Sequence, residues 1–138
     1  MKKFAFTEEY EIRANTKTLL QYLSTPNGLT SWFAESVTPS QTDKNILDIV
    51  WDSIHHQARL TVNKSIGLVR YQFSGPTESG QDPSFLEFKI NYSELTSSSF
   101  LKITDFSEMS DVAELQSLWE GLIYKLKSLV GDRSLIRA

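Results

Sequence analysis

The stretch that predicts the fold is Leu23-Ser24-Thr25-Pro26-Asn27-Gly28-Leu29-Thr30-Ser31-Trp32-Phe33. Pro26 suits the first turn of a short helix, because its missing N–H would have no partner there in any case. The residue before a proline is biased away from α geometry, so a helix that carries Leu19, Leu20 and Leu23 ends before Pro26. These signals predict two short consecutive helices near the start of the chain.

A long helix is predicted at the other end, beginning near Ser110. Ser110 is a good N-cap residue, and the carboxylates of Asp111 and Glu114 complement the helix dipole in the first turn. Gly131 is the expected stop. The apolar residues recur at helical spacing: Leu115, Leu118, Trp119, Leu122, Leu126 and Leu129. A helix of about twenty residues spans about 30 Å, which is enough to cross a small sheet.

Six strand-like segments complete the pattern, namely residues 4–12, 46–51, 55–62, 68–73, 85–92 and 100–106. Turn residues separate them, and residues 74–84, with Gly75-Pro76 and Asp82-Pro83, predict a long, mobile loop. The order is β-α-α-β-β-β-β-β-α. It predicts an α+β helix-grip fold, in which a curved antiparallel sheet wraps around the C-terminal helix, and a single domain over residues 1–138.

Composition excludes several classes of function. The net charge is −3 and Lys and Arg are mostly scattered singly, which argues against a nucleic-acid partner. Without cysteine there is no thiolate chemistry, and no glycine-rich turn offers a phosphate cradle, so we expect no cofactor. There is no apolar run long enough to cross a bilayer and no apolar stretch behind Met1-Lys2-Lys3. We therefore expect a cytoplasmic protein without membrane insertion.

The order of elements and the two end motifs resemble the START-like (SRPBCC) superfamily. More narrowly, the chain resembles the branch related to activators of the heat-shock chaperone ATPase, the Aha-type proteins. In that branch the helix pair reads Leu-Thr-Asp-Pro-x-x-Leu-x-x-Trp-Phe, which residues 23–33 follow with Thr25 in place of the usual Asp. Residues 58–62 and 67–73 are similar to the paired central strands of the family.

The C-terminal helix carries a second part of the resemblance. Trp119, Ile123, Leu126 and Lys127 match the Trp-x₃-Leu-x₂-Leu-Lys pattern of the family. Two departures stand out: Leu118 occupies a position where Gly is common, and the segment before the helix is reduced to residues 104–106. The resemblance implies the fold but no single function, since START-like domains include lipid carriers, cyclases, hydroxylase domains and chaperone regulators.

No catalytic or metal site is visible in the pattern. His55 and His56 are adjacent, and neighbouring residues of a strand point to opposite faces, so the two rings cannot chelate one ion from regular β geometry. Ser74-Gly75 and Ser79-Gly80 are turn residues, and the nucleophile spacing Gly-x-Ser-x-Gly does not occur. The lack of a convergent acid–base set weighs against an enzyme.

A pocket between the sheet and the last helix is the candidate binding site. Its predicted wall consists of the inward residues of the helix and of the strands that it faces: Trp119, Leu122, Leu126, Tyr71, Phe88, Tyr92 and His56. Polar-tipped groups among hydrophobic ones are typical of a small-molecule pocket, although a filled core with each tip hydrogen-bonded fits the pattern equally well. Gly121, inside the helix, indicates close approach to another backbone or room for a ligand.

Three functions remain open on this evidence. The first is a non-catalytic domain that binds a small hydrophobic molecule. The second is a protein-interaction module, with a protein partner or a second copy of the chain, or a chaperone regulator of the Aha type. The third is an enzyme of the cyclase or hydrolase type. Whether the interior holds a cavity is the missing fact on which all three depend.

Overall fold

A computed structural model of the protein describes residues 3–74 and 83–132. Within them, one antiparallel sheet of seven strands runs in the order β1-β7-β6-β5-β4-β3-β2. The strands are β1 (Phe4–Ile12), β2 (Ser36–Pro39), β3 (Ile46–Trp51), β4 (Ile54–Asn63), β5 (Leu68–Ser74), β6 (Phe85–Ser93) and β7 (Ser98–Ser107). The helices are α1 (Thr16–Ser24), α2 (Pro26–Trp32) and α3 (Val112–Val130).

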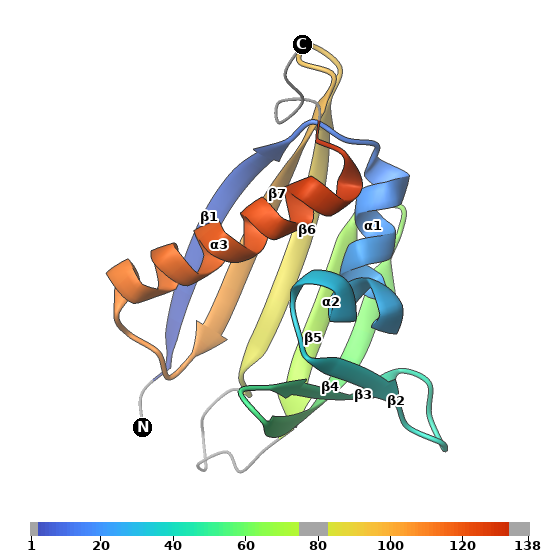
Figure 1. The fold of residues 1–138 in the computed structure, drawn as a ribbon, viewed down its shortest axis with the longest axis vertical. Helices are drawn as coiled ribbons and strands as arrows, with labels where there is room; N and C mark the ends of the chain where they lie inside the picture. The colour runs from blue at the N-terminus through green and yellow to red at the C-terminus, as the bar shows by residue number, and fades with distance from the viewer. Residues whose placement is uncertain (1–2, 75–82, 133–138) are drawn as a thin grey trace.

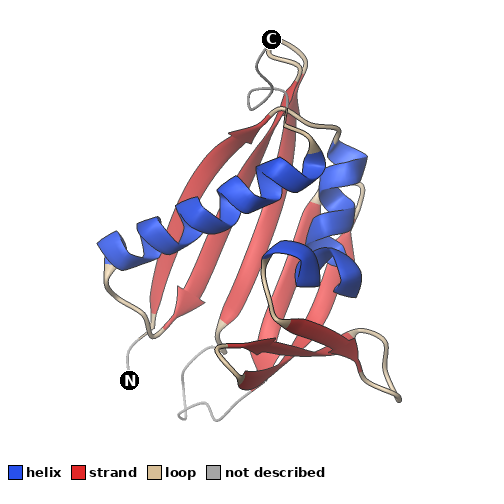
Figure 2. Cartoon of the chain, in the orientation of Figure 1, coloured by secondary structure: helices blue, strands red, loops and turns tan. Residues whose placement is uncertain are grey.

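All three helices lie on one face of the curved sheet, and α3 runs diagonally across it (Figures 1 and 2). This arrangement confirms the predicted α+β helix-grip fold. Among the described residues, no helix is long and apolar enough to cross a membrane. The core lies between the sheet and the helices, where Trp32, Trp119, Tyr71 and Phe88 are the largest side chains that are almost fully buried.

The sheet has one strand that the sequence did not predict. β2 pairs with β3 in antiparallel register, with Val37 opposite Ile49. Four residues are too few to show an alternation of apolar and polar side chains. The strand is defined instead by its hydrogen bonds to β3, which follows it in the chain. Of the predicted long loop, Ser74 ends β5, and residues 75–82 lie outside the described part of the structure.

The helix pair is held by two hydrogen bonds that its motif residues supply. Thr25 caps α2, because its hydroxyl oxygen accepts from the backbone N–H of Gly28 at 3.0 Å. Thr25 is thus the N-cap of α2, a position at which short polar side chains are preferred. The indole N–H of Trp32 donates to the carbonyl oxygen of Tyr22 on α1 at 2.9 Å. Trp32 thus ties the end of α2 to α1, whereas the Thr25 cap stabilises the first turn of α2.

Gly28 is required by close packing, whereas Gly121 is not. A Cβ atom on Gly28 would lie 2.4 Å from the carbonyl oxygen of Gln21 and 2.7 Å from Cα of Tyr22, both backbone atoms of α1. At Gly121 a Cβ atom would meet nothing within 4 Å. The interpretation of Gly121 as a point of close approach or as room for a ligand is therefore wrong, because this residue faces solvent.

Alanine substitutions at these two glycines should have opposite effects. Gly28→Ala should destabilise the fold by about 1–3 kcal/mol, because the helix pair has to shift. Gly121→Ala should stabilise it by up to about 1 kcal/mol, because glycine is a poor helix former. Urea unfolding of both variants measures the difference. Destabilisation by both would contradict the described environment of Gly121.

α3 begins one residue later than predicted. Asp111, not Ser110, is the N-cap, and its carboxylate accepts from the backbone N–H of Glu114 at 3.1 Å. Gly131 ends the helix in the left-handed conformation (φ 72°), as predicted. The buried residues are Leu115, Trp119, Ile123 and Leu126. Leu118 and Leu129, predicted in the same stripe, are 48% and 41% exposed, because the face of α3 that meets the sheet is narrower than the apolar stripe.

Truncation of Trp119 should reveal how much stability this helix face supplies. Trp119 is 2% exposed. Trp119→Ala should lower the free energy of unfolding by about 3–5 kcal/mol, because the core closes only partly around the cavity. Leu118→Ala, on the exposed side of the same helix turn, is the control and should stay within about 0.5 kcal/mol. Equal effects in denaturant melts would show that the orientation of α3 is different.

Candidate functional site

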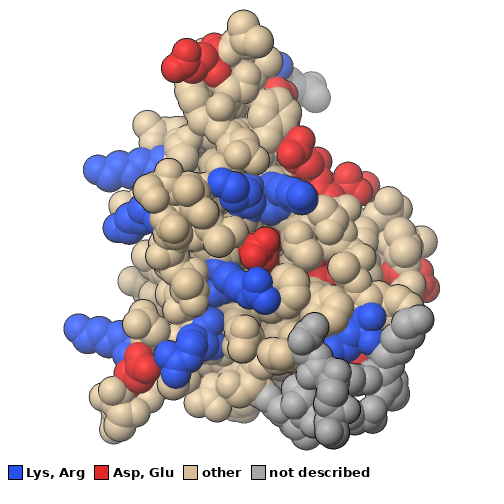
Figure 3. Space-filling model, turned by 180° about the vertical axis from the view of Figure 1, so that it is seen from behind, with Lys and Arg blue, Asp and Glu red and all other residues tan. Residues whose placement is uncertain are grey.

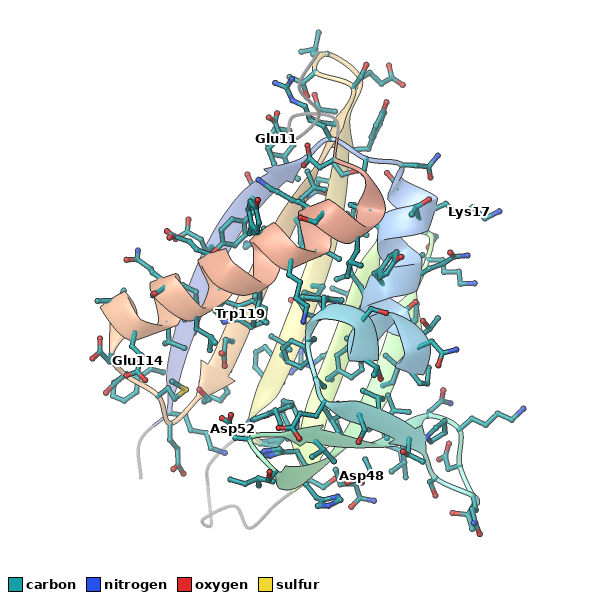
Figure 4. The ribbon with its side chains drawn as sticks, in the orientation of Figure 1. Glu11, Lys17, Asp48, Asp52, Glu114 and Trp119 are labelled. Carbon is teal, nitrogen blue, oxygen red and sulfur yellow. The ribbon has the colours of Figure 1, made fainter. Side chains whose placement is uncertain are left out.

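A cleft of about 940 Å³ lies on the inner face of the sheet. One side is formed by the ends of strands β3 to β7 nearest the β3–β4 turn, and the other by the first half of α3. Phe33, which follows α2, adds a third side. Figure 4 shows Trp119 between α3 and the sheet, Glu114 at the start of α3 and Asp52 at the β3–β4 turn.

Five aromatic rings form a continuous surface along this cleft, which we call the aromatic wall: Phe33, Trp51, His56, Phe73 and Trp119. Trp119 stacks with Phe33 at 5.9 Å between ring centres, and Phe33 meets Trp51 edge-on at 5.5 Å. Trp51 in turn stacks on His56 at 4.0 Å and meets Phe73 edge-on at 5.7 Å. Except for Trp119, these rings are only partly buried.

Strand alternation explains why these rings share one face. Leu47, Ile49 and Trp51 occupy alternate positions of β3 and therefore point to the same face of the sheet. Leu47 and Ile49 are buried. His56 lies opposite Ile49 in the β3–β4 register, and Phe73 lies opposite Ala58 in the β4–β5 register. The wall is therefore the continuation of the core into the part of the sheet that α3 does not cover.

The two histidines point to opposite faces of β4, as predicted. Nδ1 of His55 lies 2.8 Å from Oδ2 of Asp48 on the exposed side. His56 lines the cleft, and burial lowers the pKa of its ring, with a further decrease from His55 and an opposing increase from Asp48. Nε2 of His56 is buried and has no hydrogen-bond partner among the described residues. A neutral imidazole with a free nitrogen can hydrogen-bond to a bound molecule.

Asp105 is a residue of the cleft that the sequence prediction missed. It lies on β7 opposite Leu86 and Phe6, whose side chains are buried. Its Oδ2 accepts from the indole N–H of Trp119 at 3.3 Å. Burial raises the pKa of the Asp105 carboxyl, and hydrogen bonds from Trp119 and Ser107 partly oppose that rise. The sequence does contain a signal for this residue. Leu101, Ile103 and Asp105 occupy alternate positions of one strand, and a carboxylate such as Asp105 is unusual on a face that packs in the core.

The structure brings together three of the seven residues predicted for the pocket wall. Trp119, Leu122 and His56 line the cleft. Leu126, Tyr71 and Phe88 are buried in the core beside it, and Phe88 packs edge-on against Trp119 at 6.2 Å. The hydroxyl of Tyr71 donates to the carbonyl oxygen of Leu23 on α1 at 2.5 Å, and burial raises its pKa.

Tyr92 lies apart from the other predicted wall residues. It is 56% exposed and borders a separate surface hollow with Asn15 and Lys17. Tyr92 lies seven positions along β6 from Phe85 at the cleft, a distance of roughly 23 Å in a strand. The sequence showed correctly which residues alternate on β6, but not where along the strand the cleft lies.

No metal-binding arrangement is seen within residues 3–74 and 83–132, where no three His, Asp or Glu side chains gather as an ion would need. The chemistry available in the cleft is therefore aromatic and apolar contact, together with hydrogen bonding by His56, Asp105 and a few serines. Such an interior suits the binding of an organic molecule.

The raised pKa of Asp105 should be measurable as a pH dependence of stability. The folded protein holds this proton more tightly than the unfolded chain does. The free energy of unfolding should therefore decrease as the pH rises from the ordinary Asp value, about 4, through the raised value. Asp105→Asn removes this titration, so its stability relative to the wild type should increase over the same pH window.

Urea unfolding between about pH 4 and about pH 7 tests this expectation. Asp43→Asn is the control, since Asp43 lies in the β2–β3 turn, beside Arg59, away from the cleft. A stability difference between Asp105→Asn and wild type that does not change with pH would mean that the carboxyl titrates alike in the folded and unfolded chain.

Residues 1–132 match the model of the START-like superfamily domain, and the chain belongs to this superfamily. This confirms the resemblance seen in the helix-pair motif and the C-terminal helix. Among curated proteins, none matches the sequence.

Three solved structures with this fold are similar to the chain along nearly their whole length. The Aha1 dimer from Colwellia psychrerythraea superposes with a TM-score of 0.72 at 16% identity, covering 92% of this chain and 96% of that one. XoxI from Bacillus cereus gives 0.70 at 15%, covering 96% and 99%. Ara h 8.0201 gives 0.63 at 12%, covering 94% and 98%. At these identities the similarity shows the fold alone.

Proposed function

We propose that residues 1–138 form a non-catalytic START-like domain that binds a small, mostly apolar molecule in the cleft between the sheet and α3. The observation that carries this proposal is the aromatic wall. The cleft that this wall borders has a volume of about 940 Å³, which falls within the usual range for ligand pockets. Superfamily membership supports the proposal, because the fold commonly encloses hydrophobic ligands.

The energetic reason is the apolar surface that the fold leaves partly uncovered. Phe33, Trp51 and Phe73 are packed against each other but remain partly accessible from the cleft. Covering apolar surface contributes about 25 cal/mol per Å². A flat or elongated hydrocarbon in the cleft would recover that stabilisation without a change in the backbone.

The polar groups of the cleft act in this proposal as anchors and not as catalysts. Oδ2 of Asp105 is held by Trp119, and the His56 ring lies flat against Trp51. Both groups are therefore fixed in direction before a ligand arrives, which favours recognition of one or two polar atoms on an otherwise apolar molecule.

The neutral fluorescent probe N-phenyl-1-naphthylamine tests the proposal. It should bind with increased emission and, at a hundred times its Kd, raise the free energy of unfolding by about 2.7 kcal/mol. Ser117→Trp places a large side chain from the exposed side of α3 at the cleft and should weaken probe binding about tenfold or more.

Ser128→Trp is the matched control, since Ser128 is exposed on the same helix and lies outside the cleft. It should leave the probe affinity unchanged. Absence of probe binding to the wild type, or equal weakening by both variants, would refute the cleft as the binding site. The protein-interaction role predicted from the Aha-type resemblance would then be the better interpretation.

A further inference from the structure

The outer face of the sheet carries charges of both signs, whereas the charged side chains among the described residues of the cleft are all acidic. Arg59, Arg70, Lys89 and Lys102 alternate with buried residues on β4, β5, β6 and β7, and therefore point away from the helices. Figure 3 shows Lys and Arg side chains spread over this outer face. On the helix-covered side, the residues that line the cleft include Asp52, Asp105 and Glu114 but, among those described, no Lys or Arg.

Asp105 is the most enclosed of the three carboxylates. It is held by Trp119 and Ser107, which are neutral hydrogen-bond donors. No described Lys, Arg or His forms an ion pair with it. A buried carboxylate is costly without an opposite charge, and two neutral donors leave part of its acceptor capacity free. Within residues 3–74 and 83–132, no basic side chain neutralises the carboxylate of Asp105.

The aromatic wall is a second feature of the cleft that favours a positively charged ligand. The faces of aromatic rings carry negative electrostatic potential and attract ammonium groups within about 6 Å of the ring centre. Trp51, Phe33 and Trp119 are part of this wall, and Asp105 is hydrogen-bonded to the last of them. Asp105 meets Trp119 at the N–H edge of the indole, so a cation at Asp105 finds its aromatic partners among the partly exposed rings of the same cleft, Phe33, Trp51 and Phe73.

We propose that the ligand of this cleft is an organic cation, an amine or ammonium group on an apolar body. The inference rests on the proposed ligand-binding function and specifies its ligand class. The ammonium group lies against the carboxylate of Asp105, and the apolar body lies along Phe33, Trp51 and Phe73. Glu114 and Asp52, at the edge of the cleft, attract the cation as it enters.

Three probes of equal chain length separate charge from apolar contact: decylammonium, decanol and decanoate. Each displaces N-phenyl-1-naphthylamine from the protein, at concentrations below aggregation. Decylammonium should bind about tenfold or more tightly than decanol, because a hydrogen bond to a charged group contributes about 1.5–3 kcal/mol. Decanoate should bind most weakly. Added salt should reduce the preference for the cation and leave decanol binding unchanged.

The double variant Asp105→Asn/Glu114→Gln should lose the preference for decylammonium over decanol, because it removes the two carboxylates that attract the cation. Its control is Asp43→Asn/Glu120→Gln, which also removes one Asp and one Glu charge but at positions outside the cleft. Glu120 lies on α3, as Glu114 does. This control should keep the preference. If substitution of Asp105 prevents folding, Glu114→Gln alone is compared with the wild type and should show a smaller preference for decylammonium over decanol. The salt titration on the wild type then provides the second measurement.

The outcomes distinguish this inference from the proposed function. If decanol and the neutral dye bind but decylammonium binds no tighter, or if both double variants keep the preference, the cation inference is overturned and the apolar cleft stands. If neither decanol nor the dye binds, the binding function itself fails.

Discussion

The fold depends on the contact between α3 and the inner face of the sheet, which centres on Trp119. Its ring stacks with Phe33 behind α2, meets Phe88 of β6 edge-on and donates a hydrogen bond to Asp105 of β7. One side chain therefore joins three elements that are far apart in the sequence. Removal of its contacts would uncouple α3 from both the helix pair and the sheet at once.

The cleft is a consequence of the direction in which α3 crosses. The helix runs diagonally over β1, β7 and β6 (Figure 1), and the cleft lies beside its first half, at the ends of the strands near the β3–β4 turn. Strand alternation continues into that uncovered part, and the inward positions there are aromatic. Trp51, His56 and Phe73 pack against one another in place of a covering helix, and this leaves them partly exposed.

The polar groups of the interior fall into two kinds. Tyr71 is fully occupied by its bond to Leu23 and ties β5 to α1, so its hydroxyl is part of the framework. Asp105 and His56 face the cleft and have hydrogen-bonding capacity that the described residues do not use. Polar-tipped residues among apolar ones therefore have two roles here. Tyr71 is part of the filled core, whereas Asp105 and His56 lie beside the cleft.

The sequence by itself determined the helix pair, the order of the elements other than β2, and the inward face of the predicted strands, because these follow from local signals. Proline at the start of α2, the αL glycine at Gly131 and period-two alternation act within a few residues of the chain. Only the tertiary structure decided where along the strands the cleft lies, and so why Tyr92 is remote from it while Asp105 lines it. The physical reason is that the crossing angle of α3 and the strand register are set by contacts between distant segments, which no local pattern encodes.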